Sequence, residues 1–142
     1  GIGVKAFYRA GNAQPAWDNY AADNAASKYA KLYATVGEIT SEVAIVSPCP
    51  AMLTEGAGVG SESTCESEDG TVYYIPNNME AAEYYMHTLK MYDNMVMTAV
   101  DEDGSLTFGV KKEQTIDGDW SIFDDFSLTY YGAGADAYKL YL

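Results

Sequence analysis

The stretch from Gly118 to Gly132, GDWSIFDDFSLTYYG, constrains the fold of this chain more than any other. Its residues alternate in character. One parity is mostly apolar, the other mostly polar, and this period of two predicts a half-buried β-strand. The apolar set is Trp120, Ile122, Phe126, Leu128 and Tyr130, and the polar set is Ser121, Asp125, Ser127 and Thr129.

Asp124 interrupts this alternation, because it has the parity of the apolar set. In an uninterrupted strand its carboxylate would point into the core, where it needs a cation, hydrogen bonds or a proton. A bulge near Phe123 would shift the parity and turn Asp124 outward. Calcium binds oxygen ligands, so Asp124 is the candidate metal ligand of the sequence. The alternative is a carboxylate that accepts hydrogen bonds from backbone N–H groups.

The composition narrows the classes of function. The net charge of −13 over 142 residues argues against binding to nucleic acid or to anionic membrane surfaces. No run approaches the roughly 20 apolar residues of a membrane-spanning helix, so membrane insertion is not expected. The 13 tyrosines combine apolar area with a hydrogen-bonding tip, which suits β-structure and wet binding surfaces.

The rest of the chain reads as short strands separated by turn signals, which predicts a single antiparallel β-sandwich domain with one short helix. Residues 12–27 are either a long loop or a loop that runs into a short helix. Residues 51–70 are expected to form a loop, and residues 133–142 a short helix or an added strand. A helix is expected after Pro76, with Asn77 as its candidate N-cap. Strands are expected at residues 2–10, 28–36, 42–47, 72–75, 94–100 and 106–111.

Cys49 and Cys65 lie in one region rich in Gly, Ser and Glu. A disulfide between them would close a loop of about 17 residues and stabilise the fold by about 3 kcal/mol. Such a bond would place the protein in an oxidising compartment. The alternative is two unrelated thiols.

The sequence offers little for catalysis, and we expect no enzyme activity. His87 is the only histidine, and no serine or cysteine nucleophile lies near it in the chain. One histidine and two cysteines are too few for a zinc site of the usual kind. Paired carboxylates are plentiful, but nothing singles out a pair for glycoside hydrolysis.

Trp17 and Tyr20 share a segment with Asn19 and other polar residues. An exposed aromatic ring can stack on the apolar face of a sugar, while Asn and Arg side chains bond its hydroxyl groups. We therefore take Trp17, Tyr20, Asn19 and Arg9 as candidate glycan-binding residues. The same composition also occurs in ordinary loops, and Arg9 can instead pair with an acidic neighbour.

The closing stretch resembles the last strand of a β-sandwich domain in large surface and secreted proteins of glycan-degrading anaerobic bacteria. The pattern there reads approximately G-D-W-x-x-F-D-N-F-x-L-x-Y-Y-G. Further pieces fit the same domain in order; they are AFYRAG at residues 6–11, KLYA at 31–34, YIPNNMEAA at 74–82, MYDN at 91–94 and GSLTFGVKK at 104–112. The resemblance implies a galactose-binding-like jelly roll, used as a carbohydrate-binding or adhesive module outside the cell or on its surface.

The resemblance also bears on Asp124 and on the start of the chain. A closing-strand Asp in such modules often helps to hold structural calcium, and Asp124 occupies the matching place, with Asp125 where Asn is more usual. The family pattern begins earlier than residue 1, so we expect a missing N-terminal segment, or a strand from a neighbouring subunit, to complete an unpaired edge.

Our leading hypothesis is therefore a non-catalytic extracellular carbohydrate-binding module. The second is a structural or adhesive subunit of a surface assembly, and the third a glycan-active hydrolase.

Overall fold

Strand β1 (Ile2–Arg9) is the middle strand of one sheet, and its alternation builds the core. Its even-numbered residues face a second sheet and are buried against Ala30, Leu32 and Ala34. Phe7, on the other face, is buried beneath a helical layer. Both faces of β1 are thus covered, which explains why nearly every residue of this strand is buried.

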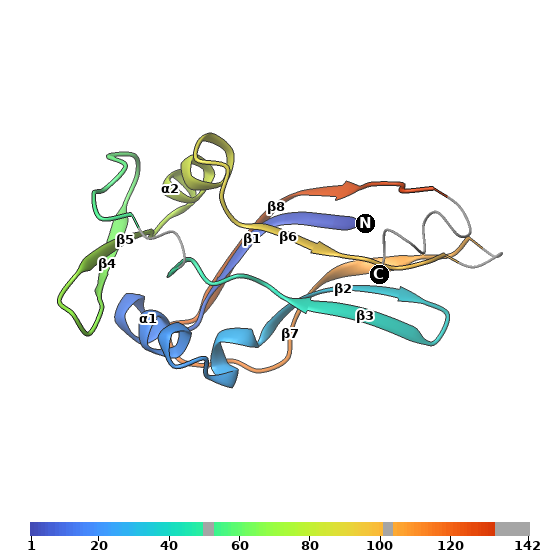
Figure 1. The fold of residues 1–142 in the computed structure, drawn as a ribbon, viewed down its shortest axis with the longest axis horizontal. Helices are drawn as coiled ribbons and strands as arrows, with labels where there is room; N and C mark the ends of the chain where they lie inside the picture. The colour runs from blue at the N-terminus through green and yellow to red at the C-terminus, as the bar shows by residue number, and fades with distance from the viewer. Residues whose placement is uncertain (50–52, 101–103, 133–142) are drawn as a thin grey trace.

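The molecule is an antiparallel β-sandwich, as the sequence predicts. The computed structural model describes residues 1–49, 53–100 and 104–132. One sheet has the order β6-β1-β8 and the other β3-β2-β7, and a separate hairpin pairs β4 with β5 (Figure 1). The remaining strands are β2 (Ala30–Val36), β3 (Ile39–Ala44), β4 (Glu62–Glu66), β5 (Val72–Pro76), β6 (Asp93–Val96), β7 (Thr107–Lys112) and β8 (Trp120–Leu128).

Helix α2 (Met79–Glu83) continues into a π-helical turn, η3 (Tyr84–Thr88), and together they cover the outer face of the first sheet. Asn78 caps α2, because its side chain accepts a hydrogen bond from the backbone N–H of Ala81 at 2.9 Å. The N-cap is therefore one residue later than predicted. The buried side chains beneath this layer are Phe7, Ala82, Tyr85, Met86, Tyr92 and Ile122.

Helix α1 (Ala13–Ala21), the 3₁₀ turn η1 (Ala25–Lys28) and the β4–β5 hairpin occupy the end of the molecule away from the N-terminus (Figure 1). Residues 12–27 therefore contain a short helix and most of a 3₁₀ turn, so of the two alternatives the long loop is wrong. The predicted loop at residues 51–70 is wrong in its second half, because it contains β4. The strand was not predicted because the stretch is rich in Gly, Ser and Glu. Its Cys65 is nevertheless buried against α1 and Ile75.

Strand β3 also differs from expectation. Residues 42–47 were expected to form a buried strand, since they are apolar on both parities. The strand instead spans Ile39–Ala44 at the edge of its sheet, where Ile39 is 72% exposed. The buried apolar residue of this region is Ile45, which follows directly after the end of the strand.

Strand β8 contains a bulge, two residues later than the one considered at Phe123. Gly3 pairs with Ser127 and Lys5 pairs with Asp124, so two residues of β8 stand opposite Val4. Asp125, within the bulge, has a left-handed backbone conformation, with φ at +51°. A Cβ at Gly3 would lie 2.5 Å from Ser127 Oγ, so a larger residue there would require the Ser127 side chain to rotate.

The start of the chain is paired on both sides rather than left as an edge. Strand β1 bonds to β6 and β8, and the Gly1 amine donates to the carbonyl of Thr129 at 2.7 Å. Among the described residues, the outer strands of the two three-stranded sheets are β6 and β8 in one and β3 and β7 in the other. Residues 101–103, between the strands predicted at 94–100 and 106–111, and the 133–142 tail lie outside the described residues. None of the described helices combines the length and apolar character needed to cross a membrane.

Candidate functional site

Asp124 lies on the same face of β8 as Ile122, but its carboxylate is not in the core. Ile122 is covered by α2 and η3, whereas Asp124 lies two residues further along the strand and its side chain is 60% exposed. Its Oδ1 accepts a hydrogen bond from the backbone N–H of Asp125 at 2.9 Å. One carboxylate oxygen of Asp124 therefore accepts a backbone hydrogen bond, as the alternative to a metal ligand predicts, and the other oxygen does not take part in that bond.

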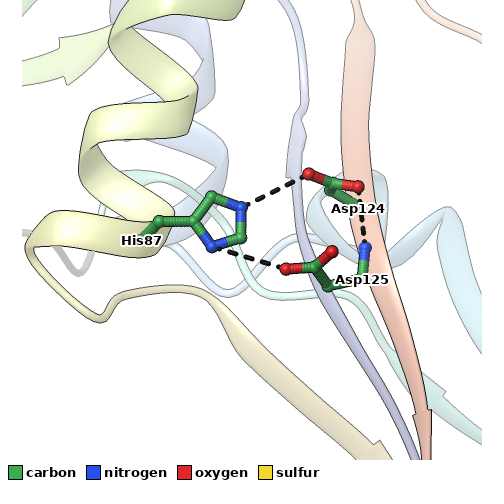
Figure 2. Close-up of side chains that lie close together, drawn as sticks. All are labelled: His87, Asp124 and Asp125. Carbon is green, nitrogen blue, oxygen red and sulfur yellow. Dashed lines mark hydrogen bonds and ion pairs between the residues drawn. The ribbon is translucent and has the colours of Figure 1, made fainter.

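That second oxygen faces His87, which lies on the π-helical turn 37 residues away in sequence (Figure 2). His87 Nε2 is 3.3 Å from Asp124 Oδ2, and His87 Nδ1 is 3.5 Å from Asp125 Oδ2. The imidazole is thus held between two carboxylates. One atom of each side chain can be chosen so that all lie within 4.8 Å of one another.

The π-helical geometry helps to place this histidine. In η3 the N–H of Leu89 bonds to the carbonyl of Tyr84, five residues back, at 3.1 Å. Such turns are rare in proteins and are frequently found at functional sites. Beside His87 and Asp124 lies an open cleft of about 520 Å³ between the helical layer and β8, and Glu80 and Glu83 also line it. The site therefore combines a histidine, adjacent aspartates and a solvent-filled hollow.

The predicted glycan-binding aromatics do not form an exposed platform. Trp17 is only 8% exposed and stacks on Tyr73, with ring centroids 5.0 Å apart and planes at 23°. It also contacts Tyr20 at 5.8 Å, and it belongs to the small core around Cys49 and Cys65. The expected stacking of a sugar on the face of Trp17 is therefore wrong, because the ring is covered by the protein.

The polar partners, Arg9 and Asn19, are also occupied. Asn19 donates to the carbonyl of Ala10 at 3.1 Å and accepts from Asn24 at 3.0 Å. Arg9 is buried, donates to Asn77 at 2.7 Å and lies 4.5 Å from the ring of Trp120. Burial lowers the pKa of Arg9, and its Nε atom has no hydrogen-bond partner among the described residues. Both side chains hold the fold together rather than lining one surface with Trp17.

The disulfide expected between Cys49 and Cys65 is not present. Both residues are free thiols, buried together at the junction of α1 and the β4–β5 hairpin. The hydrogen bond to Cys65 and burial raise the pKa of the Cys49 thiol. The thiols are therefore neighbours, as the predicted pairing requires, but they pack as small apolar groups.

A second unassigned surface lies where β7 and β8 form facing edges of the two sheets. The rings of Phe108 on β7 and Phe126 on β8 are 5.6 Å apart, and Phe123 is 6.2 Å from Phe126. These rings are 42%, 42% and 52% exposed, respectively. We call Phe108, Phe123, Phe126 and Leu128 the open edge. It is apolar surface on strands that have no further strand beside them in the described parts of the chain.

The side chain of Asp119, just before β8, is buried and fully hydrogen-bonded, in contrast to the exposed side chains of the open edge. Its side chain is 4% exposed and accepts hydrogen bonds from Tyr8 at 2.8 Å, Lys112 at 3.2 Å and the N–H of Ile116 at 3.2 Å. Burial alone would raise the pKa of Asp119, but these donors outweigh it and lower the pKa. This carboxylate joins the two sheets and is fully committed to structure.

Comparison of the chain with protein-family models, with curated proteins and with solved structures finds no match. Its function must therefore be inferred from its own residues. His87 and the open edge were both missed by sequence reasoning. The partners of His87 are distant in sequence, while Phe108, Phe123 and Phe126 read as ordinary residues of half-buried strands.

Proposed function

We propose that this domain is a non-catalytic structural or adhesive module of an assembly outside the cell, and that the open edge accepts a strand from a neighbouring chain. The observation that carries this proposal is the group of touching phenylalanine rings, each at least 42% exposed, across the edges of both sheets. Unpaired edges invite another strand, and exposed apolar patches commonly mark interaction sites.

The charge around the open edge supports a basic partner. Asp124 and Asp125 lie beside Phe123 and Phe126 on β8, and both acidic side chains are at least 60% exposed. Two copies paired through β8 would bring these acids together, and each copy carries a net charge of −13. The structure therefore favours a different, extended segment with apolar residues in alternation and basic residues near its ends over a second copy of this chain.

A synthetic peptide of alternating valine and threonine with lysine at both ends tests this proposal. Hydrogen exchange of the β8 amides, followed by NMR or mass spectrometry, should slow on peptide addition. Phe126→Asp should abolish the protection, because it places a charge among the apolar rings. Ile39→Asp is the matched control, since Ile39 is an exposed apolar residue on the other sheet's far edge, β3.

Three other results of the exchange experiment would change the occupant or reject the surface. Protection of β8 that requires only a higher protein concentration would indicate a second copy as the occupant. Protection in a longer chain that carries its own preceding segment, with no peptide added, would indicate an intramolecular strand. Equal protection in wild type and Phe126→Asp would reject the open edge as the binding surface.

Glycan binding remains a second candidate, at a different place from the one expected. A hollow of about 590 Å³ lies beside α1, and Gln14, Trp17, Asp18, Glu66 and Glu68 are among the residues that line it. Its size suits a small ligand, and carboxylates can bond sugar hydroxyl groups. A glycan array should give a signal that Asp18→Ala removes and the exposed control Glu38→Ala retains. An array with no signal for the wild-type chain would remove this candidate.

A further inference from the structure

We infer that His87, Asp124 and Asp125 form a binding site for a divalent transition-metal ion such as Zn²⁺. The cluster provides an imidazole nitrogen together with carboxylate oxygens, drawn from two elements that the fold brings together (Figure 2). Calcium prefers six to eight oxygen ligands, whereas imidazole nitrogen with carboxylate suits zinc and its neighbours in the first transition row. The donor set therefore changes the identity of the ion expected at Asp124.

The distances assign Nε2 of His87 and Oδ2 of Asp124 as the metal ligands. These atoms are 3.3 Å apart. With metal–ligand bonds of about 2.0–2.2 Å, two ligands of one tetrahedral ion lie about 3.4 Å apart. The pair can therefore share an ion with little movement, which exposed side chains on a strand and a helical turn allow.

The remaining contacts are those expected of groups that orient the ligands. The backbone N–H of Asp125 holds Oδ1 of Asp124 at 2.9 Å and leaves Oδ2 free for the ion. The carboxylate of Asp125 faces Nδ1 of His87 at 3.5 Å, on the opposite side of the ring from Nε2. Metal-binding histidines commonly donate their second N–H to a carboxylate in this way, which fixes the tautomer and the ring orientation.

The cleft beside the cluster supplies room for further ligands. Glu83 lines the same cleft and precedes His87 by four residues, so the helical backbone places both side chains on one face. Rotation of the Glu83 side chain, or water from the open cleft, would complete the coordination. The ion would join the helical layer to β8, and so it would stabilise the junction between them.

Isothermal titration of Zn²⁺ into the chelator-treated protein tests the inference. One ion per chain should bind, and at a concentration about 100 times the dissociation constant the unfolding midpoint should rise by roughly 5 °C or more. His87→Gln and Asp124→Asn should weaken binding at least 100-fold. Asp125→Asn should weaken it about 10- to 100-fold, because that residue orients a ligand without binding the ion.

Asn is the appropriate substitution at residue 125, since it tolerates the left-handed backbone found there. Asp117→Asn, in an exposed turn outside the cluster, is the matched control and should leave binding unchanged. Co²⁺ provides a spectroscopic check, because its visible absorption should show nitrogen and oxygen ligands. A thiolate charge-transfer band would instead place the ion at Cys49 and Cys65 and overturn the inference.

Three other results would also overturn it. The first is a titration that does not saturate, which would leave His87 as the partner of a simple ion pair. The second is undiminished Zn²⁺ affinity in His87→Gln. The third is Ca²⁺ binding at least as tight as Zn²⁺ binding, which would restore the calcium expected from the resemblance. The unfolding midpoints of the metal-free variants must be measured alongside, so that loss of binding is separated from loss of the fold.

Discussion

The two halves of strand β8 obey the same sequence pattern and end in different environments. In the first half, Ile122 packs beneath α2 and η3, and Asp119 anchors the start of the strand to both sheets. In the second half, beyond the bulge, Phe126 and Leu128 alternate just as regularly but remain exposed. The alternation in sequence thus predicts which side chains share an apolar face. Whether that face is buried depends on which other elements pack against it.

The bulge at Asp125 separates these halves, and it places the proposed metal ligand before the bulge and most of the open edge on β8 after it. Before it, Asp124 projects from the face of Ile122 toward His87. After it, Phe126 turns toward Phe108 at the open edge. One extra residue in the strand therefore presents a ligand-binding face and an apolar edge side by side.

The largest contrast along β8 is expected between its two faces, when the adjacent residues Ile122 and Phe123 are truncated in turn. Ile122→Ala should lower the free energy of unfolding by about 2–4 kcal/mol, because it opens a cavity beneath the helical layer. Phe123→Ala, one residue later on the exposed side, should cost much less despite the larger side chain removed. Urea unfolding followed by tryptophan fluorescence measures both. Equal losses would show that the two faces of β8 are covered alike in solution.

Asp119→Asn should have an intermediate effect, about 1–3 kcal/mol, because the amide cannot serve the donors from Tyr8 and Lys112 equally well. The pKa of Asp119 is lowered in the folded state, by hydrogen bonds that outweigh burial. Its contribution is therefore fully present above the unfolded pKa of about 3.9 and is lost as the pH falls through the folded pKa.

The same variant therefore carries a pH signature. The difference in stability between wild type and Asp119→Asn should be largest near pH 7 and shrink as the pH is lowered below about 4. Urea titrations at several pH values between neutral and acid measure it. A difference that stays constant over that range would assign the effect to packing rather than to the carboxylate charge.

Much of the sandwich follows from local pattern, and its failures have identifiable causes. Strands β1 and β2 were predicted because their alternation is clean and both bury the apolar parity. Strand β4 was missed because its few buried residues lie among Gly, Ser and Glu. Asn78 was missed as the cap because Asn77 is chemically equivalent, and only the hydrogen bond to Ala81 distinguishes them.

The candidate sites were harder to predict than the strands, since they depend on tertiary contacts. Asp124 was singled out by its parity, but nothing near it in sequence indicates His87. Trp17 was expected to be exposed because its neighbours are polar. It is buried because the β4–β5 hairpin, some fifty residues later in the chain, supplies Tyr73 and Cys65 as its cover. Sequence therefore identified residues with unusual chemistry more reliably than it identified their partners.

The smallest effect on stability, and the most informative, is expected for Phe126→Ser. The residue is 42% exposed and its ring packs against Phe108 and Phe123, so its loss should cost about 1 kcal/mol. Ile39→Ser, on the far edge of the other sheet, gives the baseline for an exposed apolar residue. A cost for Phe126→Ser that matches Ile122→Ala would mean that the open edge is already covered within the isolated chain. A small cost, combined with lost peptide protection in Phe126→Asp, would mean that the edge is built to be covered by something else.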